Sequence, residues 1–190
     1  MFNWASRHKD FQKDVFVRGA RQHHALLRSK ATPEAKKLHN WNRQVGMGYC
    51  KTISFLRLKT SKKGILYGEI NPEHRIEDLV TRHFMKRFPT YMILIGSSRG
   101  TFLAVRNSYR GHVDQPLKQF LHQLESYLSD DHILADLDFD ESWWETYYDS
   151  QEIPERENKR LFLQFMPKKY HYMTDHERKQ LSKIRRLDSF

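Results

Sequence analysis

The stretch "GILYGEINPEHRIEDLV", residues 64 to 80, places a predicted strand directly before a predicted helix. Residues 65–70 have the composition of a strand. Asn71 is a preferred N-cap residue and Pro72 a preferred first residue, so a helix is predicted over 71–88. Its apolar stripe has the 3.6-residue period of an amphipathic helix and comprises Ile76, Leu79, Val80, His83 and Phe84. The junction therefore predicts a strand that leads straight into a helix.

Outward from this junction, helical segments alternate with pairs of strands. Thr32 is a possible N-cap with Pro33 in the first turn, and the helix that follows is expected to end near Tyr49. The other predicted elements are a helix over 7–29, an antiparallel hairpin of strands 52–60 and 65–70, a second hairpin of strands 91–96 and 101–107, and helices over 117–128 and 155–164. The order helix-ββ-helix-ββ predicts an α+β fold with a four-stranded, mainly antiparallel sheet, helices packed on it and a helical C-terminal region.

The length of 190 residues suits a single domain. We expect an N-terminal helical segment over residues 1–30, an α+β core over 31–175 and a basic C-terminal tail over 176–190. A monomer is favoured.

Charge is distributed unevenly along the chain, whose net charge is +10. Residues 1–124 carry 23 basic and 8 acidic side chains, whereas residues 125–157 carry 1 basic and 12 acidic ones. The basic excess favours an anionic partner, of which nucleic acid is the commonest, and a solvated basic surface is the alternative. The acidic stretch is expected either to brace basic elements or to keep DNA away from one side.

Cys50 is the single cysteine, so no disulfide can form within the chain, which fits a reducing cytoplasm. A core thiol is favoured for it over a nucleophile. The first residues lack the apolar run of a secretory signal, and no apolar run approaches 18 residues. A cytoplasmic location without membrane contact is expected.

The junction also concentrates groups that can carry chemistry. Glu73 follows Asn71 and Pro72, and all three are explained by helix initiation, since a carboxylate suits the positive end of a helix dipole. A functional alternative exists for Asn71, Glu73 and the adjacent His74, because a strand end that meets a helix N-terminus presents backbone N–H groups to phosphate or water.

Glu69 is not explained by helix initiation. In a pleated strand it shares a face with Ile65 and Tyr67, and an inward-facing carboxylate needs a partner or a function. The direction of this face therefore decides whether Glu69 belongs to a site.

A second candidate is "MPKKYHY", residues 166 to 172. Lys168 and Lys169 beside Tyr170 suit phosphate contact combined with stacking, and a Tyr170 tucked into the core is the alternative. The remaining candidates for DNA contact are Arg43, Arg57 and Lys59, and those for base stacking are Tyr49, Tyr67 and Trp41. "WWETYY", residues 143 to 148, is expected to be core.

The sequence contains no pattern that holds a metal or a nucleotide. His23 and His24 are adjacent and cannot easily point at one ion, and no His-Glu-x-x-His, P-loop or Gly-x-Gly-x-x-Gly motif occurs. No cofactor is expected.

Four segments together carry a resemblance to a known family. They are "SFLRLK" at 54–59, "LYGEINPEHRIEDLVTRHFMKRF" at 66–88, "YMILI" at 91–95 and "WWETYYDSQEIPERENKRLFLQFMPKKYHYMTD" at 143–175. The chain resembles small bacterial proteins assigned to DNA metabolism or DNA repair. Their module occurs alone, beside a radical-SAM protein, or fused behind UdgX-type uracil-DNA glycosylases. His171 stands where the family usually has tryptophan, and these 190 residues include no such glycosylase domain.

The resemblance implies work on DNA in a bacterial cytoplasm and assigns no catalytic residue. Cleavage of an N-glycosidic bond needs a carboxylate near C1′ that orients water, a hydrogen bond to the departing base, and aromatic surfaces for the flipped base. A DNA glycosylase acting on a damaged base, or on the hypermodified bases of foreign phage DNA, is therefore expected. Glu69 or Glu73 would orient water, and Asn71 or His74 would assist the base. The alternatives are a non-enzymatic DNA-binding module that positions a partner repair enzyme and, less favoured, an RNA-binding protein.

Overall fold

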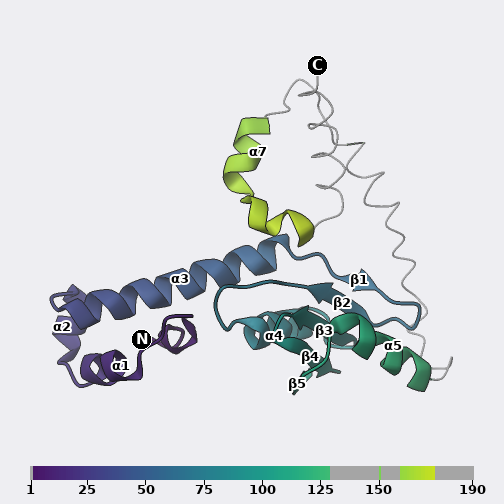
Figure 1. Ribbon diagram of the computed structural model, residues 1–190, viewed down its shortest axis with the longest axis horizontal. Helices are drawn as coiled ribbons and strands as arrows, with labels where there is room; N and C mark the ends of the chain where they lie inside the picture. Colours follow the sequence, from purple (N-terminus) through teal and green to yellow (C-terminus); the bar gives the residue numbers. More distant parts are fainter. Residues whose placement is uncertain (1, 129–149, 151–158, 174–190) are drawn as a thin grey trace.

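A five-stranded mixed sheet in the order β1-β2-β3-β4-β5 forms the centre of the fold (Figure 1). The computed structural model describes residues 2–128, 150 and 159–173. The strands are β1 (Lys59–Thr60), β2 (Leu66–Glu69), β3 (Met92–Ser97), β4 (Gly100–Val105) and β5 (Ser108–Val113). β2 and β3 run parallel, and the other neighbours pair antiparallel.

The α+β class and the two predicted hairpins are confirmed, whereas the four-stranded sheet is wrong in two respects. β2 and β3 are parallel because the helix between them carries the chain back across the sheet before β3 begins. β5 escaped prediction because it is polar, contains Gly111 at φ +111°, and pairs with β4 through a register shift at Leu103/Ala104.

The helices flank this sheet and extend the fold at its N-terminal side. They are η1 (Ala5–Arg7), α1 (Lys13–Ala20), α2 (His24–Ser29), α3 (Pro33–Phe55), α4 (Glu77–Arg87), α5 (Leu117–Tyr127), α7 (Lys159–Phe165) and η4 (Lys168–Met173). The single helix predicted over 7–29 is wrong, because the His23 side chain caps a new helix by accepting a hydrogen bond from the Ala25 N–H at 3.3 Å. The predicted helix over 155–164 corresponds to α7, and its first four residues lie outside the described residues.

α3 begins as predicted and ends later than predicted. The Thr32 hydroxyl accepts the Ala35 N–H at 3.2 Å, which confirms the N-cap. The helix continues through the segment predicted as strand 52–60, where Thr52 and Ser54 hydroxyls donate to carbonyls four residues earlier, both at 2.8 Å. These bonds keep β-branched and hydroxyl residues compatible with a helix. The strand prediction was wrong for all but its last two residues.

The segment after β2 is a loop and not a helix start. α4 begins at Glu77, with Ile76 as its N-cap residue, so the predicted N-cap at Asn71 and first turn at Pro72 are wrong. Partners distant in sequence satisfy the loop: the Arg75 N–H donates to the Arg7 carbonyl at 3.0 Å. Tertiary hydrogen bonds therefore replace the helical ones that local preference favours.

The two faces of the sheet pack against different helices. Ile93, Ile95 and Ala104 face α4 and the C-terminal half of α3, together with Met166, Tyr170 and Met173 from the η4 region. Ile65 and Leu94 face Leu117 of α5 on the opposite side. In the α4 stripe Ile76, Val80 and Phe84 are buried, whereas Leu79 and His83 are half-buried.

α3 links the sheet to the N-terminal segment. Figure 1 shows α3 extending from the end where α1 and α2 pack to the end where η4 packs. A separate apolar cluster joins Ala5, Val15 and Leu27 to Leu38 and Trp41 of α3. Trp41 is thus buried in this cluster, away from the role of a stacking surface. Cys50, expected in the core, is exposed on α3.

Several predictions concern residues outside the described part of the chain. They include most of the acidic 125–157 stretch, "WWETYY" and the 176–190 tail. Within the described part, no helix is both long and apolar enough to cross a bilayer.

Candidate functional site

A pocket lies where α3, the loop of residues 71–76 and η4 meet. Its volume is about 350 Å³ counted out to its open mouth. The residues that line it are Gly48, Thr52, Asn71, Pro72, Glu73, His74, Ile76 and Tyr170. Ligand sites of small molecules start at about 300 Å³, so the pocket has room for one small group such as a single base.

Four of the residues singled out in the sequence converge on this pocket. Asn71, Glu73 and His74 come from the 71–76 loop, and Tyr170 comes from η4, about a hundred residues later. Tyr170 is only 7% exposed, and its ring packs against Phe55 with centroids 5.3 Å apart. The core position expected as the alternative for Tyr170 is thus confirmed, with the added finding that the residue also lines the pocket.

Glu69 does not line the pocket. Its strand face bears Ile65, which is buried, and Tyr67, which is half-buried and packs with the α5 cluster. Glu69 itself, at the end of β2, is exposed. The face of β2 that bears Glu69 is therefore directed toward α5, so the carboxylate is neither buried nor part of the site.

The remaining candidates are distributed over other surfaces. Arg43, Arg57, Lys59 and Lys168 are exposed, and Arg57 donates to the Ser54 carbonyl at 2.8 Å. Lys169 belongs to η4. None of these cations lines the pocket described here, so they can contact a partner only around it.

Tyr49 is packed inside the fold and does not stand beside the pocket as a stacking surface. Its ring lies 5.5 Å from that of Trp4 and 6.2 Å from that of His83. Burial, with a smaller effect of Cys50, raises the pKa of Tyr49 above its ordinary value. Burial, followed by the charge of Arg87, lowers the pKa of His83. Both side chains are therefore uncharged at neutral pH.

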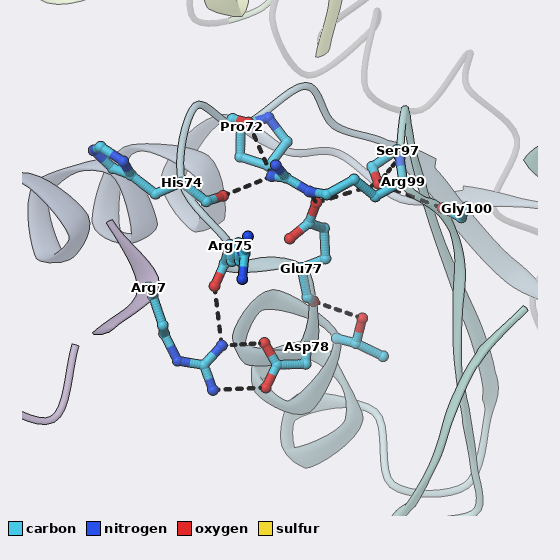
Figure 2. Close-up of polar contacts among 10 residues, drawn as sticks. Arg7, Pro72, His74, Arg75, Glu77, Asp78, Ser97, Arg99 and Gly100 are labelled. Atoms are coloured by element: carbon cyan, nitrogen blue, oxygen red, sulfur yellow. Dashed lines mark hydrogen bonds and ion pairs between the residues drawn. The ribbon is translucent and has the colours of Figure 1, made fainter. Parts of the chain in front are cut away.

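Arg99 fixes the backbone of the 71–76 loop. Figure 2 shows this side chain reaching from the turn between β3 and β4 to the loop and to the start of α4. Its guanidinium donates to the carbonyls of Pro72 and His74 at 3.2 and 2.8 Å and to Glu77 Oε1 at 2.5 Å. The Glu77 side chain is 3% exposed, and the Ser97 hydroxyl also contacts it, at 3.3 Å. A buried carboxylate thus holds the arginine that sets the loop.

The N-terminal segment holds the loop from its other side. Arg7 forms a bidentate ion pair with Asp78 and donates to the Arg75 carbonyl at 2.9 Å, as Figure 2 shows. Lys9 Nζ lies 3.8 Å from Glu73 Oε2, with both side chains about half exposed. The pocket wall is therefore fastened to a segment more than sixty residues earlier in the chain.

Two buried imidazoles stack beneath the pocket. The His8 and His74 rings have centroids 4.5 Å apart, and the residues are 5% and 7% exposed. His8 Nε2 lies 2.6 Å from Gln44 Oε1, and His74 Nδ1 accepts the Lys9 N–H at 3.4 Å. An Nδ1 that accepts carries no proton, so in this arrangement any ring proton of His74 is on Nε2.

The sequence gave no local signal for several residues that build this site. Gly48 and Thr52 lie in α3, and His8, Glu77 and Arg99 support the loop from three separate segments. Arg99 lies in a turn that reads only as a hairpin connection, "SSRG". Its role depends on a contact between elements more than twenty residues apart, which no pattern within either element encodes.

Gly48→Ala is expected to raise the free energy of unfolding by about 0.5–1 kcal/mol, because glycine is unfavourable inside a helix. An added Cβ meets only His74 Cδ2, at the ordinary contact distance of 3.6 Å. Urea denaturation followed by circular dichroism measures the gain. Gly46→Ala is the matched control two residues away: its Cβ would lie 2.9 Å from Trp4 Cζ3, so the gain is expected to be lost. Equal stabilisation by both changes would contradict this packing.

Comparison with known proteins identifies a family without supplying a function. A family model described as a domain of unknown function, DUF4130, matches residues 11–175. No curated protein and no solved structure matches the chain. Among the described residues, no group of three or more histidine, cysteine or acidic side chains is placed to hold a metal ion.

Proposed function

Since the chain belongs to the DUF4130 family, a domain of unknown function, we propose from its own pocket that it is a DNA N-glycosylase. It would remove a damaged or modified base and leave an abasic site. The observation that carries the proposal is the convergence of Asn71, Glu73, His74 and Tyr170 on one small pocket in a strongly basic chain.

The pocket supplies the groups that N-glycosidic hydrolysis needs. Glu73, on the 71–76 loop, would orient the attacking water and stabilise positive charge that develops on the sugar. Asn71 or His74 would hydrogen-bond the departing base. Pro72, Ile76 and Tyr170 would form the apolar part of the wall against which a flipped base rests.

The DNA backbone would be held by cations outside the pocket. Lys168 precedes Tyr170 by two residues, and Lys9 lies beside Glu73. Arg43, Arg57 and Lys59 are exposed on or just after α3 and would extend this basic surface. Phosphate contacts of this kind confer affinity that falls steeply with salt and carry no sequence information.

One observation favours a second candidate, a DNA-binding module that positions a repair enzyme. The exposed cations at Arg43, Arg57 and Lys59 do not line the pocket, and binding through them would need no catalytic group. Salt dependence is expected of both candidates, so affinity alone does not separate them.

A panel of modified DNA separates the two candidates. The pure protein is incubated with duplex and single-stranded oligonucleotides that carry uracil, hypoxanthine, oxidised, alkylated, hydroxymethylated or glucosylated bases. Alkali-labile abasic sites on at least one substrate are expected of the glycosylase. Tight binding with no abasic product on any member would reject the enzyme and leave the accessory module.

A further inference from the structure

The ionic character of the pocket differs from that of the chain as a whole. The chain has a net charge of +10, yet among the described lining residues Glu73 is the one with a formal charge at neutral pH. No lysine or arginine occurs in that described lining. The pocket therefore disfavours a phosphate group and favours a neutral or positively charged ligand.

The histidine of the pocket does not offset this negative charge. His74 Nδ1 accepts a backbone N–H, which requires an unprotonated Nδ1. The ring also stacks at 4.5 Å on a second buried imidazole, His8, and two positive charges at that separation would repel each other. His74 thus takes part as a neutral group.

The cation nearest to Glu73 leaves the carboxylate available. Lys9 Nζ is 3.8 Å from Glu73 Oε2, and the two side chains are 53% and 50% exposed. Water and salt screen a pair of this kind, so the pair holds Glu73 only weakly. A cation that enters the pocket can replace Lys9 as the partner of Glu73.

We infer that the base taken up by this pocket is positively charged, as a purine alkylated at N7 or N3 is. This substrate class rests on the proposed glycosylase function. Tyr170 adds an aromatic wall, and aromatic rings attract cations. The three polar contributors are a carboxylate, an amide and a neutral imidazole, a set suited to a cationic heterocycle.

The chemistry of such a base fits the groups available. Water attacks C1′, the N-glycosyl bond breaks with its electron pair passing to the base nitrogen, and the cationic base leaves as a neutral molecule. The proton that water loses passes to Glu73 and then to solvent. No acid is needed to protonate the leaving base, and Glu73 can remain a carboxylate until it takes this proton.

A pair of DNA ligands that differ in charge alone tests the inference. Both are duplexes with a 2′-fluoro sugar, which prevents cleavage: one carries 7-methylguanine, and the other carries the neutral 7-deaza-7-methylguanine. Binding of the full-length protein is measured for both ligands at one salt concentration. About tenfold tighter binding of the cationic ligand is expected, with the preference lost in Glu73→Gln and kept in Glu69→Gln. Equal affinities, or a preference that survives Glu73→Gln, would overturn the inference.

The two levels of the proposal fail separately. Abasic product from the panel without a charge preference would reject the cationic substrate class and leave the glycosylase in place. A charge preference without product from any base would reject the glycosylase and retain the pocket as a site for cationic bases.

Discussion

Arg99→Ala is expected to lower the free energy of unfolding by about 3 kcal/mol, because it leaves the carboxylate of Glu77 buried without its ion-pair partner. That side chain is 3% exposed, and Arg99 Nε lies 2.5 Å from its Oε1. The estimate is at the lower end for a broken buried pair, since Arg99 is itself 39% exposed. The change also removes hydrogen bonds to the Pro72 and His74 carbonyls. Chemical denaturation of the full chain, monitored by circular dichroism, measures the loss.

Two comparisons assign this loss to the ion pair. Arg110→Ala removes an exposed arginine from β5 and is expected to change stability by no more than about 0.5 kcal/mol. Glu77→Gln introduced into the Arg99→Ala protein removes the unpaired charge and should restore part of the stability. A loss below about 1 kcal/mol for Arg99→Ala, or no recovery in the double variant, would refute the role given to this pair.

Glu73→Gln is expected to lower the rate of base excision at least about a hundredfold, because glutamine is a poor acceptor for the proton of the attacking water. Stability should change by no more than about 0.5 kcal/mol, since the Glu73 side chain is 50% exposed and its ion pair with Lys9 is a surface one. Single-turnover excision on the best substrate of the panel, together with a denaturation curve, separates the chemical effect from unfolding.

Glu69→Gln is the matched control for this prediction. It is a carboxylate only four residues earlier, on the exposed end of β2 and outside the pocket. Excision by this variant should match that of the unmodified protein. Equal losses from the two substitutions, or full activity in Glu73→Gln, would show that the pocket carboxylate has been assigned wrongly.

The sequence predicts well where local pattern and tertiary packing agree. The Thr32 cap and the β3–β4 hairpin followed from residue type and alternation, and both are present. The α3 terminus did not, because "TISF" is compatible with either a strand or a helix. The decision came from its packing, with Thr52 buried and Phe55 against Tyr170.

The candidate site was predicted in part for a similar reason. Asn71, Glu73 and His74 are neighbours in sequence, so any structure of the loop keeps them close to one another. Their meeting with Tyr170 and Gly48 depends on the path of the whole chain. The loop itself replaced the predicted helix start because Arg99 and Arg7 bind its backbone, and a pattern-based prediction considers each segment without such partners.

The stacking of His8 on His74 has a consequence for how the boundary of this domain is drawn. The family match begins at residue 11, after Arg7, His8 and Lys9. A chain shortened to the matched region would retain every residue that lines the pocket and lose the ring on which His74 rests. The limits of sequence similarity and the limits of the working unit therefore differ by about ten residues, and the smallest active fragment has to begin before the similarity does.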